Sequence, residues 1–312
     1  MGALSLDLDN KWSYLKTRGD EAWRDYPSYL PAVVPFLQTY LAERRLEVTV
    51  FIVGKDCELP GHEPLLRSIA EAGHEIGNHS YRHEPWLHRY RDDEVRDEIS
   101  RSTQVIQKAT GVRPIGFRGP GYSVTDAVRE TLADSDYSYD ATTLPTWIGP
   151  LARAYYFRST GLNRDDRKQR EALFGRWRDG FLPNRPQLQT VNGTRLLEIP
   201  VTTMPLLKVP IHFSYLHQLA GISERLAEGY LETALRMCAV AGFGPSVLLH
   251  PLDFLGREDV EGLDFFPAMN QEGELKRQRL SRFLDRINDH FELKPLRDYA
   301  ASFAARKWND EP

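Results

Sequence analysis

The sequence predicts an α/β fold built from parallel βα units. Apolar or alternating segments recur about every 30 to 40 residues, and amphipathic segments with helical spacing separate them. Residues 47–54 are almost continuously apolar, as expected of a parallel strand that is covered on both faces. Several of these segments end in polar side chains, and the carboxyl ends of strands are where such folds place their sites.

The predicted strands and helices alternate along most of the chain. The first strand lies within residues 3–10, where apolar residues alternate with small or acidic ones, and further strands are expected within 47–54, 72–78, 115–117, 137–142, 195–202, 245–251 and 291–296. Helices are expected over 29–44, 62–72, 92–110, 125–135, 223–241 and 274–290. Gly73 and Gly111 end two of these helices, and Thr125 is expected to cap another.

Two stretches fall outside this alternation. Residues 10–29 are expected to form a loop whose aromatic side chains either make a small satellite core or face a ligand such as a sugar ring. Residues 144–191 are expected to be a long insertion with one short charged helix, either a solvated surface segment or a flap over an acidic substrate. Since no linker or repeat divides the chain, we expect one domain over residues 1–312.

The composition favours a globular cytoplasmic protein. Lys and Arg number 40 and Asp and Glu 44, a net charge of −4 that argues against bulk electrostatic binding to nucleic acid or anionic lipid. Because the chain enters a strand pattern almost at once, with no basic and then apolar segment before it, we expect no signal peptide. No apolar run approaches the roughly 20 residues of a transmembrane helix. Cys57 and Cys238 are far apart, as expected of reduced thiols.

Two histidines, His79 and His83, stand four residues apart just after the short strand within 72–78. If a helical turn begins there, their side chains lie one above the other on the same face. That arrangement suits two imidazoles that hold a divalent metal ion, although histidines bonded to solvent or to the core can show the same spacing. Acidic residues at the end of another strand favour the metal site.

Polar residues do end the other predicted strands. Asp7 and Asp9 close the first strand, and Arg118 and His250 follow two later ones. In a barrel of parallel strands the carboxyl ends converge on one mouth. Two carboxylates on one side of a strand repel each other, and a cation relieves that cost. We therefore expect these four residues to share a site with the histidine pair.

These motifs resemble those of the polysaccharide deacetylases with a nodulation-type catalytic domain, carbohydrate esterase family four. The similar segments, in the family's order, are Asp7-Leu8-Asp9, His79-Ser80-Tyr81-Arg82-His83, Arg118-Gly119-Pro120 and Leu248-Leu249-His250-Pro251. The resemblance covers about residues 3–255 and is most specific at the histidine motif. It implies a distorted (β/α)7 barrel and a hydrolase that removes an N-acetyl or other N-acyl group from an amino sugar in a poly- or oligosaccharide.

The resemblance also implies roles for the motif residues. Asp9, His79 and His83 would hold a divalent ion, by default zinc, with positions left open for water and substrate. Asp7 would take a proton from the attacking water as general base. Arg118 would pair with Asp7 and keep it ionised.

The remaining roles concern the leaving group and the acyl group. His250 would protonate the departing amine as general acid. A backbone N–H at Gly121 or Tyr122 would bind the oxyanion, and Leu248 would line the acyl pocket.

The sequence departs from the family pattern at two points. The usual acidic pair is two adjacent aspartates, whereas Leu8 separates Asp7 from Asp9 here, so the two roles could be exchanged. The residue that orients the catalytic histidine is also open, with Glu198, Asp140 and Asp253 as candidates.

Three other functions stay open at this point. The substrate could be an acylated sugar on a polyprenyl phosphate, which the Arg-rich insertion favours. The chain could be a non-catalytic sugar-binding module, although its intact acidic, histidine and arginine residues speak against that. It could also hydrolyse small cyclic ureides, since enzymes of that class share this barrel type.

Overall fold

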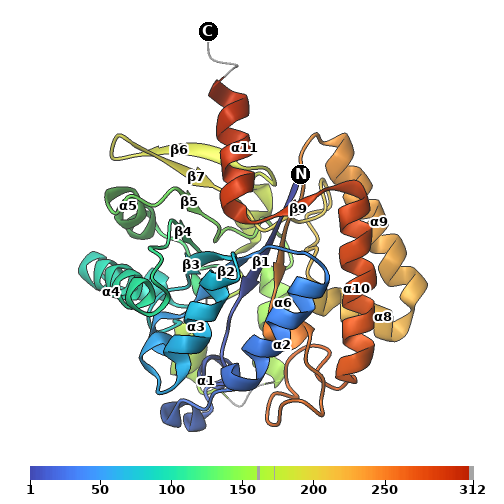
Figure 1. Ribbon diagram of the computed structural model, residues 1–312, viewed down its shortest axis with the longest axis horizontal. Coiled ribbons are helices and arrows are strands. Elements are labelled where there is room, and N and C mark those ends of the chain that lie inside the picture. Colours follow the sequence, from blue (N-terminus) through green and yellow to red (C-terminus); the bar gives the residue numbers. More distant parts are fainter. Residues whose placement is uncertain (160–161, 172, 309–312) are drawn as a thin grey trace.

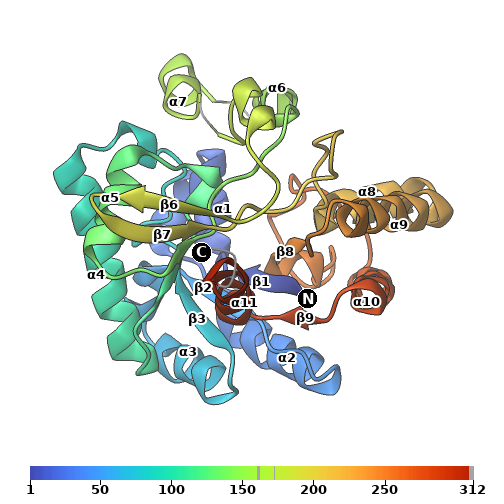
Figure 2. The same cartoon turned by 90° about the horizontal axis from the view of Figure 1, so that it is seen from above.

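The predicted parallel strands form one curled sheet in the computed structural model, which describes residues 1–159, 162–171 and 173–308. The strands follow the order β6-β7-β5-β4-β3-β2-β1-β8, and β9 pairs with β1. Figure 2 shows the helices arranged around the outside of this sheet. The strands are β1 (Gly2–Asp7), β2 (Thr49–Ile52), β3 (Glu75–Asn78), β4 (Gly116–Phe117), β5 (Tyr139–Asp140), β6 (Gln187–Val191), β7 (Thr194–Glu198), β8 (Ser246–Leu249) and β9 (Leu293–Lys294).

All strand pairs are parallel except β6 with β7, as the predicted βα units require. The outer helices are α2 (Leu30–Glu43), α3 (His62–Glu71), α4 (Asp92–Thr110), α5 (Asp126–Asp134), α8 (Phe213–Ile222), α9 (Glu224–Val240) and α10 (Gly273–His290). On α2 the side chains of Leu30, Val33, Val34, Leu37 and Leu41 are buried, which is the helical spacing read from the sequence. The prediction of a distorted α/β barrel is confirmed.

The segment 10–29 differs from the predicted loop. It contains α1 (Lys11–Arg18) and the 3-10 turn η1 (Glu21–Asp25). Asn10 caps α1, since its side chain accepts a bond from the Lys11 N–H. Tyr14 and Tyr29 join the main hydrophobic core, so these rings serve packing more than an open ligand surface.

The segment 144–191 is also richer in structure than predicted. It holds two helices, α6 (Gly149–Ser159) and α7 (Arg164–Gln169), and the 3-10 turn η5 (Trp177–Phe181). Its last five residues form β6, which pairs antiparallel with β7 and extends the sheet. Figure 2 shows α6 and α7 outside the ring of the other helices.

A C-terminal helix that was not predicted, α11 (Leu296–Trp308), covers the amino-terminal end of the sheet (Figure 1). Leu296 and Tyr299 pack there against Ala3 and Phe51. The carboxyl ends of the strands lie at the opposite end and carry the predicted site residues. Both cysteines are free thiols, as predicted. Among the described residues, no helix combines the length and the apolar character that crossing a membrane requires.

Candidate active site

Neighbouring strands place the predicted metal ligands at one edge of the sheet. Asp7 ends β1, Asp9 follows two residues later, and His79 comes directly after β3. Strand β2 lies between β1 and β3 and is parallel to both. The acidic pair and the first histidine therefore leave the same edge of the sheet, one strand apart, as the strand ends predicted.

The two histidines meet without the helical turn that their spacing suggested. Residues 79–83 form an irregular loop, in which Ser80 and His83 have positive φ values of 62° and 50°. Hydrogen bonds impose this path: the Ser80 N–H donates to Asn78 Oδ1 at 2.9 Å, and the His83 N–H donates to Ser80 Oγ at 3.2 Å. These local bonds, together with the 2.9 Å bond from the Gly54 N–H to the Ser80 carbonyl, replace helical periodicity in bringing the two rings together.

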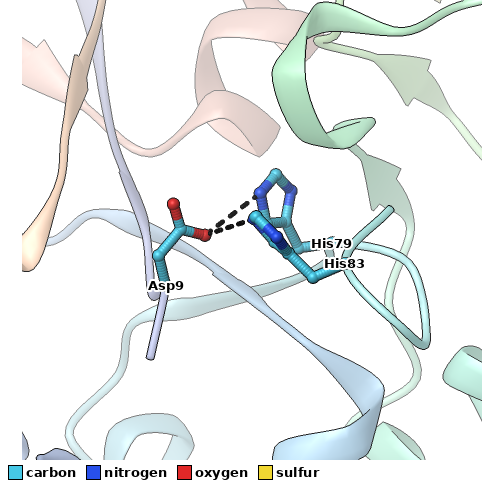
Figure 3. A group of neighbouring side chains, drawn as sticks. All are labelled: Asp9, His79 and His83. Carbon is cyan, nitrogen blue, oxygen red and sulfur yellow. Dashed lines mark ion pairs between the residues drawn. The ribbon is translucent and has the colours of Figure 1, made fainter. Parts of the chain in front are cut away.

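Both imidazoles face Asp9 (Figure 3). Asp9 Oδ1 lies 2.9 Å from His83 Nε2 and 3.4 Å from His79 Nε2. The three side chains are buried, and their potential ligand atoms all lie within 4.8 Å of one another. One carboxylate and two imidazoles are a common donor set of catalytic zinc and non-haem iron sites, which keep positions open for water and substrate.

The hydrogen bonding of His79 provides a test of whether a cation fits this donor set. His79 Nδ1 lies 2.6 Å from the carbonyl oxygen of Arg118. A carbonyl can only accept, so Nδ1 carries the proton, and in the neutral ring Nε2 presents a lone pair towards Asp9. A lone pair and a carboxylate oxygen repel each other unless a cation or an added proton lies between them. The residues present therefore fit a divalent ion.

The pKa shifts of the cluster describe the alternative in which an added proton lies between the imidazoles and Asp9. Burial alone would raise the pKa of Asp9, but the imidazoles of His83 and His79 hold that pKa well below its ordinary value. Burial would likewise lower the pKa of His79, whereas the carboxylates of Asp7 and Asp9 raise it. Asp9 is thus held as an anion, the form that binds a metal ion.

Asp7 has a different environment from Asp9. Its Oδ1 accepts a 2.8 Å bond from an Arg118 terminal nitrogen, and its Oδ2 is 3.9 Å from His79 Nε2. Arg118 is almost fully buried, and its Nε donates to the Ala141 carbonyl at 3.0 Å. A buried guanidinium fixed in this way orients the neighbouring carboxylate. The structure therefore separates the two acids: Asp9 faces the histidine pair and Asp7 faces Arg118.

His250 directly follows β8, which pairs with β1 so that Leu249 is opposite Leu6. In this register His250 follows Leu249 on one strand and Asp7 follows Leu6 on the other. His250 and Asp7 therefore leave the sheet side by side. Asp253 lies beneath the histidine: its Oδ2 accepts a 2.8 Å bond from the His250 backbone N–H and is 3.9 Å from the ring Nδ1.

Of the three candidates for orienting His250, Asp253 is the one that lies next to it. Burial would raise the pKa of Asp253, but the imidazoles of His250 and His212 hold it below its ordinary value. Asp140 instead accepts bonds from Thr142, and Glu198 accepts one from Gln189.

One neighbour of the site, His212, was missed by the sequence analysis. Its ring centroid is 5.1 Å from that of His250, and its Nδ1 accepts a bond from the Ser214 N–H at 3.3 Å. Burial, together with the nearby His250, lowers the pKa of His212 to about 4, so this imidazole is neutral. His212 precedes a helix and ends no strand, so the strand-end argument could not find it.

The residues predicted to bind the oxyanion, Gly121 and Tyr122, lie on one turn. Leu248, which was predicted to line the acyl pocket, lies on β8. Gly121 and Tyr122 both have positive φ values, 60° and 63°, in the 3-10 turn η4 (Pro120–Tyr122). A Cβ at Gly121 would lie 2.5 Å from the Pro85 Cβ, so glycine is required there. The Tyr122 N–H makes a long 3.3 Å bond to the Gly119 carbonyl, and its ring packs against the cluster that contains Leu248.

A buried polar network anchors the chain just after Asp9. Asp56 Oδ1 accepts bonds from Asn10 Nδ2 at 2.7 Å and from Trp12 Nε1 at 2.8 Å. His62 adds a 3.0 Å contact between its Nδ1 and the Asp56 carbonyl. Burial raises the pKa of Asp56 to about 7. The network holds Asn10, and through it the backbone of the metal-ligand candidate Asp9.

We expect Asp56→Asn to make folding stability less dependent on pH. In the wild type the folded chain binds this proton more tightly than the unfolded chain, so stability falls as the pH rises from 3.8 to about 7. Asparagine keeps the acceptor oxygen and does not ionise. The unfolding free energy of the variant minus that of the wild type should rise by about 2–3 kcal/mol between about pH 5 and pH 8 in urea titrations. A pH-independent difference would contradict titration of this carboxyl group.

Comparison with known proteins gives matches to carbohydrate deacetylases. The family model described as polysaccharide deacetylase matches residues 20–139. A peptidoglycan-N-acetylglucosamine deacetylase of Bacillus cereus is 30% identical over 121 residues, which are 39% of this chain and 52% of that protein. A peptidoglycan deacetylase of Helicobacter pylori is 28% identical over 126 residues, 40% of each protein. The chain thus spans about half or less of the length of these relatives.

Solved structures show the same fold over almost the whole chain. A Mycobacterium smegmatis protein assigned as a polysaccharide deacetylase has a TM-score of 0.59 at 19% identity, covering 98% of this chain and 92% of that one. Puue allantoinase has a TM-score of 0.56 at 14% identity, covering 97% and 89%. At these identities the likeness concerns the fold alone.

Proposed function

Since residues 20–139 match the family model of polysaccharide deacetylases, we propose that the chain belongs to this family and is a metal-dependent hydrolase of the N-acetyl group, or another N-acyl group, of an amino sugar. The observation that carries the proposal is the buried cluster of Asp9, His79 and His83 beside the Asp7–Arg118 pair. Amide hydrolysis needs a base that takes a proton from water and a positive group that stabilises the oxyanion. We propose that these side chains provide the base and hold the ion that stabilises the oxyanion.

Asp9, His79 and His83 would hold the divalent ion, with zinc as our first choice. Such an ion would polarise the amide carbonyl and would lower the pKa of a water molecule. The chain itself orients the ligands, because the Arg118 carbonyl fixes the tautomer of His79.

Asp7 is proposed as the general base. Its Oδ1 is held by Arg118, which leaves Oδ2 on the side of His79. From there Oδ2 accepts a proton from the water that attacks the carbonyl carbon. The Tyr122 N–H, whose bond to Gly119 is long, can turn to the oxygen on which negative charge develops.

His250 is proposed as the general acid. Asp253 fixes its backbone and lies beneath its ring, which positions the imidazole to donate a proton to the departing amine. Leu248 lies in the small apolar cluster with Leu144 and Val201, beside Tyr122, and is proposed to line the pocket of the acyl group. An acetyl or formyl group is small enough to suit such a pocket.

His250→Ala tests the proposed acid. We expect it to lower kcat on an N-acetylated oligosaccharide by about 10²–10⁴. An activated ester such as 4-nitrophenyl acetate has a leaving group that needs no proton, so its hydrolysis should fall far less. Steady-state rates on the two substrates make the comparison, and equal losses on both would show that His250 is not the acid.

The proposed function is tested by a release assay with the purified chain. Acetate and formate are measured after incubation with N-acetylated glucosamine oligomers, peptidoglycan and an acylated sugar on a polyprenyl phosphate, and the loss of allantoin is measured in a separate incubation. Release from the free or polymeric amino sugars is expected. Release from the lipid-linked sugar alone, turnover of allantoin alone, or binding of the sugars without hydrolysis would each replace the proposal with one of the rival functions.

A further inference from the structure

An exposed apolar patch is formed by the segment between β5 and β6 and by the loop after β7. Its exposed members are Trp177, Phe181, Leu182, Leu206 and Leu207, and the half-buried Trp147 joins them. Leu206 is 85% exposed and Phe181 67%. Isolated exposed leucines are ordinary, but a contiguous group of this kind marks a surface that contacts something apolar.

The members of the patch contact one another across two separate chain segments. The Trp147 ring lies 4.9 Å from Phe181 and 5.9 Å from Trp177, centroid to centroid. Trp147 Nε1 donates to the Leu207 carbonyl at 3.0 Å, and Lys208 Nζ donates to the Leu182 carbonyl. The aromatic turn and the Leu206–Leu207 loop therefore form one surface.

Backbone bonds hold the two leucines at the tip of a tight hairpin. Thr203 and Pro210 form an antiparallel bridge, and the Lys208 N–H donates to the Met204 carbonyl at 2.8 Å. Leu206 itself has a φ of 65°, a left-handed conformation that is costly for a leucine. The fold thus maintains a strained backbone that keeps a large apolar side chain in solvent, which points to a role for that side chain.

The charge around the patch is opposite in sign to that of the whole chain. Residues 147–208 contain eleven Lys and Arg residues against five Asp and Glu residues, whereas the full chain has a net charge of −4. Arg176 and Arg178 flank Trp177 in the sequence, and both are exposed. Exposed arginines therefore lie beside Trp177 and Phe181, although the whole chain has a net negative charge.

We propose that this patch docks the protein onto the surface of an anionic lipid membrane. Leucine and aromatic side chains enter the boundary between headgroups and acyl chains, while arginines at the rim bind the phosphates. This inference does not depend on the proposed function, because it rests on none of the active-site residues. The expectation from net charge concerned bulk electrostatic binding, whereas this proposal concerns one apolar patch with arginines beside it.

Two other occupants fit the patch less well. A sugar ring stacks on a flat aromatic face, but the Phe181 ring stands at 90° to Trp147 and leucines form the tip. A second copy of the chain would bring two positively charged surfaces together, which is unfavourable for a symmetric dimer.

Vesicle binding by the full chain tests the proposal. Co-sedimentation is measured with phosphatidylcholine vesicles and with vesicles that contain about 30% phosphatidylglycerol. We expect binding to the anionic vesicles that weakens with added salt, and a partition coefficient about tenfold or more lower in Leu206→Ser/Leu207→Ser. The matched control is Ile222→Ser/Val240→Ser, which removes two exposed apolar side chains at 80% and 91% exposure on α8 and α9 and should bind as the wild type does.

Because the four changed residues are exposed, the variants are expected to fold, and an unchanged thermal unfolding midpoint checks this. Absence of wild-type binding to anionic vesicles would overturn the proposal. So would equal binding by the two double variants. A patch variant that changes the molar mass in solution, or the KM for a soluble oligosaccharide, without changing vesicle binding would assign the patch to a second copy or to a glycan instead.

Discussion

Replacing His79 by alanine is expected to remove the bound divalent ion and the hydrolysis of N-acyl sugars together. The side chain supplies one of three ligand atoms that lie within 4.8 Å of one another. With only Asp9 and His83 left, the site loses both affinity and the orientation imposed by the Arg118 carbonyl. Metal content per chain and acetate release are measured on the same preparation, and the rate should fall by about three orders of magnitude or more.

His74→Ala is the matched control for this variant. His74 is also a buried histidine, but it precedes β3, at the opposite end of the strand from His79, and its Nδ1 accepts a 3.4 Å bond from the Val48 N–H. Its loss should cost some stability while the ion and the activity remain. A His79→Ala protein that hydrolyses the substrate without a metal ion would refute the proposed ligand set.

Asp7→Asn is expected to abolish most of the activity while the ion stays bound. Asparagine has nearly the same shape, and its oxygen can still accept the bond from Arg118, so the buried guanidinium keeps a partner. It cannot accept a proton from water. The rate should therefore fall by about 10²–10⁴, with metal content and unfolding temperature close to those of the wild type.

Comparison with Asp9→Asn decides which of the two aspartates binds the ion and which one is the general base. Asp9 Oδ1 faces both imidazoles, so its amide variant should lose the ion, whereas the Asp7 variant should keep it. The opposite result, an ion lost with Asp7→Asn and kept with Asp9→Asn, would exchange the base and the ligand.

The strand ends were the part of the site that the sequence could predict. Asp7, Asp9, His79, Arg118 and His250 each follow a short apolar segment, and parallel pairing brings such ends together whatever the details of the helices. Because this argument needs only the pattern of strands, the separation of the two aspartates by Leu8 did not affect it.

The loops were not predictable, because bonds to side chains and to distant segments determine their paths. The spacing of His79 and His83 suggested a helical turn, but Ser80 and His83 have positive φ values, and the Ser80 carbonyl accepts a 2.9 Å bond from the Gly54 N–H. His212 reaches His250 through the packing of α8 against residues 251–253, the turn that follows β8, which no local pattern encodes. The aromatic residues of 10–29 hid α1, since tryptophan and tyrosine are weak helix formers.

Anomalous diffraction from crystals of the active protein, at the absorption edge of the metal found by elemental analysis, tests the central claim most directly. The account predicts one strong peak about 2.0–2.2 Å from Asp9 Oδ1, His79 Nε2 and His83 Nε2. Active crystals without a peak among these three side chains, or with the ion bound elsewhere, would contradict it.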